Sequence, residues 1–326
     1  MRRRDFLVGF VGFSAQPMCA IAQPEKRLRR IGYFGRASAQ ADAGGLAGFH
    51  AGMLALRWVE GLDYVIDARY ANGVAQAGPA LADELVASRP DLLLAPGDWS
   101  VRLLAQSTKS IPIVFAVVQD PVGDGLVASL RRPGGNATGL TSLSSELAGK
   151  RLQLLKEAFP RVTRVALMFE PDDVGSVSQA KEINQAAPRL GMRVTSIELR
   201  QAADIEPAFN RAAALGAQAC MVTVGGTANN HRKAIVDHVV HLKVPAMFGT
   251  DRFVEAGGLM AYGASVTDNF RRAAAYVDKI FKGAKPGELP VQQPTRFELV
   301  VNMKTAKAMG FTFPEAFLLR VDRTIE

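Results

Sequence analysis

The chain has 326 residues, of which 48% are apolar and 21% are charged, and its formal net charge at pH 7 is +8. This length favours two domains, and the apolar share is that of an ordinary globular protein that can bury a core. Lysine and arginine form no long cluster beyond residues 26–30, whereas nucleic-acid-binding proteins concentrate basic charge on one element. The charge therefore predicts a solvated surface and no nucleic-acid partner.

Residues 1–22 have the pattern of a cleaved export signal. A basic start precedes an apolar run over residues 6–13, and residues 20–22 (AIA) supply small side chains before a cleavage site. Adjacent arginines in the basic start also match the twin-arginine form, so both the general and the twin-arginine route stay open. The apolar run is too short to span a bilayer. The alternative, an amphipathic first helix of a cytosolic protein, is disfavoured because this segment would pack poorly.

The cysteines predict no disulfide. Cys19 lies in the export signal, and Gln16 replaces the aliphatic residue that a lipoprotein signal would have. Cys220 is then the single cysteine of the mature chain, so stability has to come from the core. Its place in a predicted buried strand favours a small core side chain over a nucleophile.

From residue 30 onward, short apolar runs alternate with helical patterns. Strands are predicted over residues 31–34, 64–70, 92–95, 113–118, 138–141, 165–169, 193–199, 219–224, 246–249, 259–262 and 297–302. Helices are predicted over residues 45–58, 76–88, 100–108, 147–159, 177–190, 205–215, 229–242, 268–281 and 304–309. Several strands are continuous apolar runs, which is typical of strands buried on both faces. The alternation predicts right-handed βαβ units, and a break over residues 139–145 divides them into two Rossmann-like parallel-sheet lobes of an α/β fold.

The loops after the predicted strands hold the candidate ligand-binding residues, because ligands of open parallel sheets bind outside the carboxyl ends of the strands. These loops combine carboxylates, hydroxyls, an arginine, aromatic rings and glycines, which suits a polar ligand. The candidates are Arg36, Ser38, Asp98, Trp99, Ser100, Gln119, Asp120, Glu170, Gly225, Gly226, Thr227, Thr250, Asp251 and Tyr262. For any one of them, the alternative is a role as a helix cap or turn residue.

Catalytic and cofactor motifs are missing from the sequence. There is no G-x-S-x-G, Walker A, H-E-x-x-H or G-x-G-x-x-G pattern. His231, His238 and His241 form the one histidine cluster, but acidic or sulfur ligands do not accompany them on the same helix face. We therefore expect no catalytic residue, no metal and no cofactor.

Five long stretches resemble one family. They are DPVGDGLVASLRRPGGNATGLTS, KRLQLLKEAFP, RFVEAGGLMAYGAS, YVDKIFKGAKPGELPVQQPTRFELVVNMKTAKAMG and the ending LLRVDRTIE. In sequence and order they are similar to the substrate-binding proteins of ABC transporters of the tryptophan/tyrosine-binding type, over about residues 30–326. The resemblance implies the type I periplasmic binding protein fold, with hinge crossings near residues 141–145, 265–268 and 289–295.

These crossings set the expected domain bounds. The N-terminal lobe comprises residues 27–143 plus 267–292, and the C-terminal lobe residues 144–266 plus 293–326.

The resemblance implies a periplasmic solute-binding component of an ABC-type importer, expected as a monomer. It would capture a small polar or anionic molecule, an amino acid or organic acid, and deliver it to permease subunits in the membrane. Arg36 departs from the small hydroxyl residues expected in members that bind aromatic amino acids, and a guanidinium favours a carboxylate. Two alternatives remain: an exported two-lobed enzyme using Asp98, Asp120 and Asp251, and an exported ligand sensor.

Overall fold

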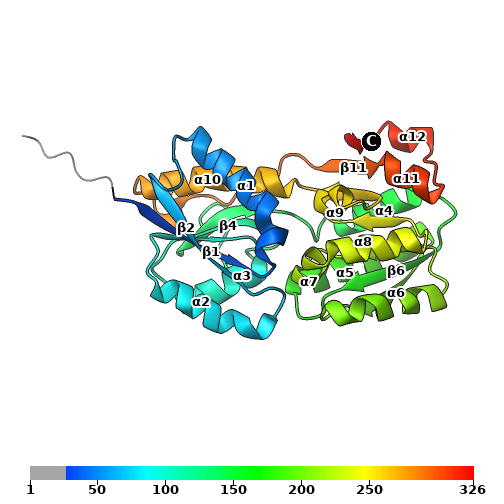
Figure 1. Cartoon of the computed structure of the whole chain (residues 1–326), viewed down its shortest axis with the longest axis horizontal. Coiled ribbons are helices and arrows are strands. Elements are labelled where there is room, and N and C mark those ends of the chain that lie inside the picture. Colours follow the sequence, from blue (N-terminus) through cyan, green and yellow to red (C-terminus); the bar gives the residue numbers. More distant parts are fainter. Residues whose placement is uncertain (1–26) are drawn as a thin grey trace, which may run out of the picture.

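The structure, a computed structural model, describes residues 27–326, so the predicted export signal lies outside the described residues. Two α/β lobes lie side by side along the long axis of the molecule (Figure 1). Each lobe has its own sheet, of five strands in the first and seven in the second. The predicted fold of two parallel-sheet lobes is confirmed.

The first lobe is built on a wholly parallel sheet in the order β2-β1-β3-β4-β5. Its strands are β1 (Arg29–Gly35), β2 (Tyr64–Tyr70), β3 (Leu92–Ala95), β4 (Ile113–Val118) and β5 (Ala137–Thr141). Helices α1 (Ala39–Ala55), α2 (Gly78–Ala87), α3 (Asp98–Ser107) and α10 (Val266–Phe281) cover its two faces (Figure 1).

The second lobe has the strand order β12-β11-β10-β9-β8-β6-β7. Its strands are β6 (Arg164–Phe169), β7 (Arg193–Glu198), β8 (Ala219–Val222), β9 (Ala246–Phe248), β10 (Met260–Gly263), β11 (Glu298–Asn302) and β12 (Arg323–Ile325). Its helices are α4 (Ala148–Ala158), α5 (Val174–Ala186), α6 (Ile205–Ala214), α7 (Gly226–Asn230), α8 (Arg232–His241), α9 (Asp251–Glu255), α11 (Met303–Met309) and α12 (Glu315–Leu318).

Three features of the second lobe differ from the sequence prediction. β11 runs antiparallel to β10, because the chain returns from the first lobe at the edge where β10 ends. β12 was not predicted, and its three residues are too few to carry a periodic signal. The helix predicted over residues 229–242 is two helices, α7 and α8, which are separated at His231.

Continuous apolar runs form the central strands because both faces of each sheet are covered. Along β3, Leu92 and Leu94 pack into the core beneath α1 and α10, whereas Leu93 and Ala95 pack into the core beneath α2 and α3. All four side chains are fully buried. Burial on alternate faces is the reason that no polar residue interrupts the run.

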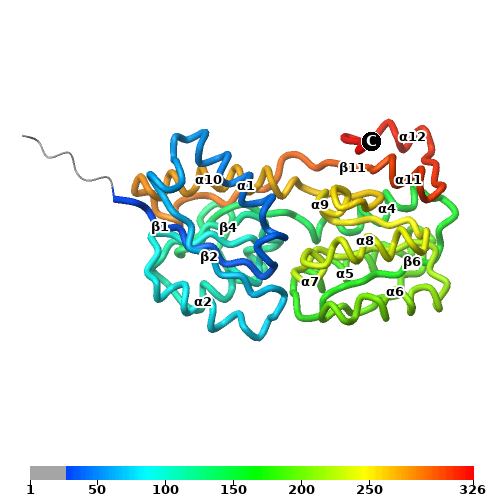
Figure 2. The backbone as a smooth tube through the Cα atoms, viewed as in Figure 1, coloured from blue at the N-terminus to red at the C-terminus, as the bar shows by residue number. Residues whose placement is uncertain are grey.

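The chain crosses between the lobes three times, which can be followed in Figure 2. The first crossing joins β5 to α4, and the second joins β10 to α10. The third leaves the first lobe after Gln292, whose backbone pairs with both Gly139 and Thr141 at β5 before the chain reaches β11. The three hinge crossings predicted from the sequence are therefore confirmed as part of the fold.

Arg151 lies beneath these crossings and is fully buried in the second lobe. Its guanidinium donates to the carbonyl oxygens of Tyr262 at 2.7 Å, Ser144 at 2.8 Å and Gly249 at 3.4 Å. Burial lowers the pKa of Arg151 to about 10. The side chain thus joins the first crossing to the ends of two strands.

Helices α1 and α10 pack closely because glycine lines their contact. A methyl group on Gly48 would lie 2.4 Å from the carbonyl oxygen of Thr267, whereas one on Gly44 in the same helix would have nothing within 4 Å. The Gly48→Ala variant should therefore lose about 1–3 kcal/mol of unfolding free energy. The control Gly44→Ala should gain about 0.5–1 kcal/mol, because alanine loses less backbone entropy on folding. Urea unfolding measures both, and two stabilising substitutions would contradict this packing.

Candidate ligand-binding cleft

The carboxyl ends of the parallel strands of both sheets face each other across a cleft. Two adjoining cavities lie there, of about 100 Å³ and about 70 Å³. We call the first the Asp98 cavity and the second the Arg252 cavity. They share the lining residues Asp42, Pro96, Val117, Gln119, Val224 and Asn229, so one molecule can reach into both.

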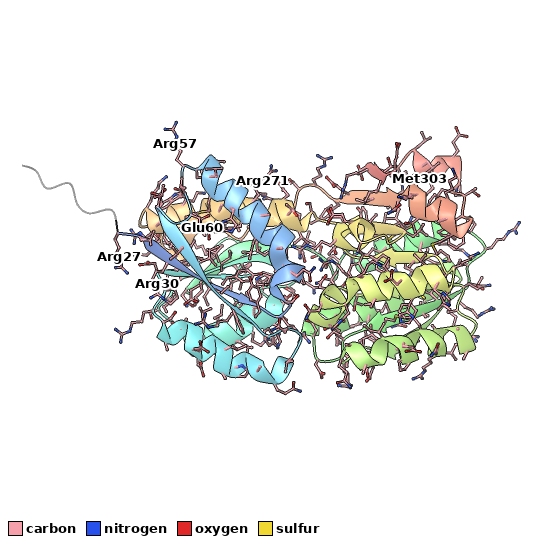
Figure 3. All side chains as sticks on the ribbon, in the orientation of Figure 1. Arg27, Arg30, Arg57, Glu60, Arg271 and Met303 are labelled. Carbon is pink, nitrogen blue, oxygen red and sulfur yellow. The ribbon has the colours of Figure 1, made fainter. Side chains whose placement is uncertain are left out.

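A larger hollow of about 570 Å³ lies on the outer face, near the second and third crossings. Arg271, which Figure 3 labels, lines it together with Arg296, and their side chains are 63% and 77% exposed. Exposed arginines are hydrated by solvent, so this hollow holds no polar group that lacks a hydrogen-bond partner. The smaller cleft cavities contain buried polar atoms without partners, and they form the candidate site.

Arg36 connects the two lobes across the cleft. The side chain follows β1 in the first lobe and lies 2.6 Å from Asp173 and 3.2 Å from Glu170 of the second lobe. Its guanidinium also stacks over the ring of Trp99, 5.7 Å from the centroid. Since Arg36 is only 7% exposed, these two carboxylates compensate for the loss of its hydration.

Glycines after β8 make room for this bridge. A methyl group on Gly226 would lie 2.6 Å from Cδ of Arg36, and one on Gly225 would lie 2.2 Å from a carboxylate oxygen of Glu170. Burial raises the pKa of Glu170, which Arg36 opposes. The two glycines therefore permit the close approach of charged side chains from both lobes.

Further hydrogen bonds join the lobes beside this bridge. The amide of Ser38 donates to Oδ1 of Asn230 at 2.6 Å, and Gln179 donates to Gln119 at 3.3 Å. Arg252 donates to the carbonyl oxygen of Ala41 at 3.1 Å. The described structure is therefore a closed arrangement of the lobes.

Asp98 begins α3 and lines the Asp98 cavity with its carboxyl 2.9 Å from the amide nitrogen of Gln119, which donates to it. The residue is 8% exposed. The pKa of Asp98 is raised to about 7, chiefly by burial and also by the carboxylates of Asp173 and Asp124, while the hydrogen bond from Gln119 opposes the rise. Asp98 therefore holds a proton to a higher pH than an exposed aspartate does.

The Arg252 cavity gathers polar atoms that lack a partner. Oγ1 of Thr250, Oδ1 of Asn229 and Nη2 of Arg252 are buried without a hydrogen bond. Together with Nε of Arg36, they are four of the six such side-chain atoms in residues 27–326. Unpaired buried polar groups are costly and rare in folded proteins, so their concentration here indicates a place for a polar ligand.

Asp42 faces the same cavity from the first turn of α1. One of its oxygens accepts a hydrogen bond from the hydroxyl of Tyr33 at 2.7 Å, and the other lies 3.9 Å from Arg252. Burial raises the pKa of Asp42, which Tyr33 and Arg252 oppose. The cavity thus carries one acidic and one basic side chain, contributed by opposite lobes.

Eight of the predicted site residues line the two cavities. They are Arg36, Asp98, Trp99, Ser100, Gln119, Gly225, Gly226 and Thr250. The loops that hold these residues lie at the cleft, and the residues remain candidates for binding.

Three other predicted residues are close to the cleft but do not line a cavity. Ser38 caps α1, with its hydroxyl accepting from the amide of Ala41 at 3.2 Å. Glu170 lies behind Arg36, and the hydroxyl of Thr227 is directed 3.5 Å away to the carbonyl oxygen of Arg200.

The remaining three face other neighbours. Asp120 is exposed and accepts from the amide of Gly123 at 2.8 Å, as in a local turn. Asp251 pairs with Arg323 at 3.0 Å, and the ring of Tyr262 packs near Phe297. The carboxylates that an enzyme would need, Asp98, Asp120 and Asp251, therefore do not meet in one cavity.

Six charged or polar residues that line the cavities were not predicted: Asp42, Ser142, Ser144, Asp173, Asn229 and Arg252. Arg252 belongs to a loop that the strand-end rule had indicated, but the first turn of α9 decides that this side chain, and not Asp251, faces the cavity. Asp42 and Asn229 lie on helices after the loops, where the sequence gives no signal of facing. Within residues 27–326, no group of three or more His, Cys, Asp or Glu could hold a metal, and no helix is long and apolar enough to cross a bilayer.

Residues 46–325 match the protein family described as ABC transporter substrate binding protein. This chain belongs to that family. The family resemblance inferred from the sequence is thereby confirmed. One relative of this substrate-binding protein is a tyrosine-binding protein of Clostridioides difficile (strain R20291), 24% identical over 251 residues that cover 77% of this chain and 72% of the relative.

Solved structures share the fold of this substrate-binding protein. A conserved domain protein from Vibrio cholerae is 27% identical, with a TM-score of 0.85, over 91% of this chain and all of that one. An ABC domain in complex with L-Trp from Streptococcus pneumonia is 24% identical, with a TM-score of 0.83, over 92% of this chain and all of that one. Other neighbours are an ABC transporter solute binding protein from Agrobacterium vitis with bound allitol and a sugar-binding protein of a sugar ABC transporter from Bacillus halodurans, and the type I periplasmic binding protein fold is thereby confirmed.

The raised pKa of Asp98 predicts how stability varies with pH. The folded protein holds this proton up to about pH 7, whereas an unfolded chain releases it near pH 4, so ionisation of Asp98 lowers the stability of the folded state as the pH rises between these values. Asp98→Asn cannot ionise and can still accept from Gln119. We expect the variant to exceed the wild type in unfolding free energy by on the order of 2–4 kcal/mol at pH 8 and by far less at pH 4. Thermal unfolding across this pH range measures the difference, and a gap that shrinks with rising pH would refute it.

Proposed function

We propose that this substrate-binding protein captures a small amino acid-like molecule between its lobes and delivers it to the membrane permease of an ABC importer. The observation that carries the proposal is the set of unpartnered buried polar groups in the Arg252 cavity, next to one acidic and one basic side chain. A ligand that is both anionic and cationic at its head meets all of these demands.

The carboxylate of such a ligand fits Arg252 and Thr250. Nη2 of Arg252 is a free donor, and the hydroxyl of Thr250, itself 5% exposed, is a second. A guanidinium binds a carboxylate strongly because the hydrogen bonds are charge-assisted and the fork geometry matches both oxygens.

The ammonium group of the ligand fits Asp42 and Asn229. The carboxylate of Asp42 keeps one oxygen directed toward Arg252, and Oδ1 of Asn229 has no donor. A ligand placed between Asp42 and Arg252 would separate two side chains that lie 3.9 Å apart and replace their weak pairing with two shorter ones.

The comparisons support an amino acid as the ligand class. One relative is named a tyrosine-binding protein, and one structural neighbour holds L-Trp. The closed arrangement supports capture of a ligand between the lobes, because the chain matches the L-Trp complex with a TM-score of 0.83 but a ligand-free, open substrate-binding protein from Clostridium difficile with 0.64. The ion pairs of Arg36 with Asp173 and Glu170 would stabilise the closed form around the ligand.

A binding experiment tests the assignment of the head group. L-amino acids are first screened by thermal shift, since a ligand that binds only the folded state raises its apparent stability. For the tightest one, Arg252→Gln and Asp42→Asn should each weaken binding about 10- to 100-fold by calorimetry, because each removes a charge-assisted pair. The matched control Asp120→Asn changes an exposed carboxylate outside both cavities and should bind as the wild type does. Undiminished affinity in the Arg252 variant would refute this assignment.

We further propose that the protein acts in the periplasm after removal of residues 1–22. The basic start, the apolar run and the AIA site support export, and transport from outside the cell requires it. Mass spectrometry of protein recovered from the periplasm should give a chain that begins at Gln23. A chain that still begins at Met1 would contradict the proposal.

A further inference from the structure

The charges that line the cleft do not balance. Asp42, Asp98 and Asp173 are the acidic lining residues, and Arg36 and Arg252 are the basic ones. Asp173 pairs with Arg36, and Asp42 faces Arg252. Asp98 is the lining carboxyl that remains without a cation.

The surroundings of Asp98 confirm this shortage. The charged groups that act on it are Asp173 from the start of α5 and Asp124 from the loop after β4, and both are acidic. Arg102 on α3 lies 3.9 Å from Asp124, and its side chain is 41% exposed. Its guanidinium therefore interacts with Asp124 and with solvent, and does not pair with Asp98. The amide of Gln119 donates to Asp98, and the side chain of Asp124 also lies within hydrogen-bonding reach of it, but neither a neutral amide nor a second carboxyl cancels a buried negative charge.

Charges behind the lining do not alter the balance. Glu170 shares Arg36 with Asp173 and adds one negative charge. Arg232 acts on Asp42 from outside the cavities and adds one positive charge. The charged groups of the cleft therefore include one positive charge fewer than negative charges, and Asp98 is the carboxyl left without a cation, in agreement with its raised pKa.

A ligand can supply the missing charge, because the Asp98 cavity opens into the Arg252 cavity through the six shared lining residues. A head group bound at Arg252, Thr250 and Asn229 leaves the rest of the molecule directed toward Asp98. Trp99 also lines this cavity, and its ring already contacts the guanidinium of Arg36 and the ring of Phe34. The hydroxyl of Thr250, which is 95% buried, has no hydrogen-bond partner. This observation independently indicates that a polar ligand binds in the adjoining Arg252 cavity.

We propose that Asp98 determines specificity by pairing with a cationic group at the end of the ligand's side chain, so that the ligand is a basic amino acid. This inference rests on the proposed binding of an amino acid head group in the Arg252 cavity. When the ligand binds, Asp98 releases its proton to water and the ammonium or guanidinium of the ligand takes its place. An acidic side chain is excluded by repulsion, and an apolar one leaves the carboxyl unpaired or protonated.

Calorimetry with L-lysine, L-arginine and L-norleucine tests the proposal, because norleucine has the carbon chain of lysine without its ammonium group. The wild type should bind lysine or arginine about 10- to 100-fold more tightly than norleucine, the strength of a charge-assisted pair. Affinity for the basic ligand should rise up to about tenfold per pH unit from pH 6 to pH 7 and level off near pH 8, because the proton of Asp98 must leave. Norleucine should show no such rise.

Variants separate this inference from the proposed function. Asp98→Asn should remove both the preference for lysine over norleucine and the pH dependence of lysine binding. Asp120→Asn, the matched control, should keep the wild-type preference and pH profile. Equal affinity of the wild type for lysine and norleucine, or pH-independent binding of lysine, would overturn the proposal whether or not the Asp98 variant folds.

L-tyrosine and L-glutamate complete the panel. If tyrosine binds more tightly than lysine, and Arg252→Gln but not Asp98→Asn weakens it, the head-group assignment stands and the role of Asp98 falls. If glutamate binds most tightly, the charge argument is wrong. If no amino acid binds at all, the proposed function itself is refuted.

Discussion

A buried guanidinium organises the side of the cleft that belongs to the second lobe. Arg151 has no carboxylate partner among its hydrogen bonds, so backbone carbonyl oxygens and neutral side chains must satisfy it. Those partners come from the first crossing at Ser144 and from the ends of β9 and β10, at Gly249 and Tyr262. Because an unsatisfied buried guanidinium would be very costly, these segments are held in one arrangement. Ser144 and Gly249 also line the Arg252 cavity, so the shape of the candidate site depends on this interaction.

Charged side chains form part of the contact between the lobes. Each lobe brings groups to the cleft that are buried on closure: Arg36 from the first, and Asp173 and Glu170 from the second. Asp173 shows how the demands combine, because one oxygen caps α5 and the other pairs with Arg36. In an open arrangement water would solvate these groups, so the net gain on closure is modest and leaves the equilibrium sensitive to a ligand. Small residues at positions 225 and 226 keep the approach possible.

Most of the architecture follows from local pattern. The bounds predicted for β2, β3 and β4 are those observed. β3 and β4 are continuous apolar runs, and turn-forming residues follow each of the three strands within two residues. The parallel order of the first sheet follows from the alternation of strand and helix. The antiparallel β11 could not be predicted in this way, because its direction depends on where the chain re-enters the second lobe. The division of the helix at His231 could likewise not be predicted, because no glycine or proline marks this position in the sequence.

The sequence by itself determined the fold class, the family and the loops that surround the cleft. These properties depend on periodicity, on long stretches of residues and on the rule that parallel strands expose their carboxyl ends at one edge. Only the tertiary structure decided which side chains of those loops face the cavities: Arg252 and not Asp251, Asp98 and not Asp120. The choice depends on helix phase and on pairing with residues of the other lobe, such as Asp173 with Arg36, 137 positions apart in the chain. The net charge inside the cleft is the sum of charged side chains from both lobes, so it cannot be read from any one segment of the sequence.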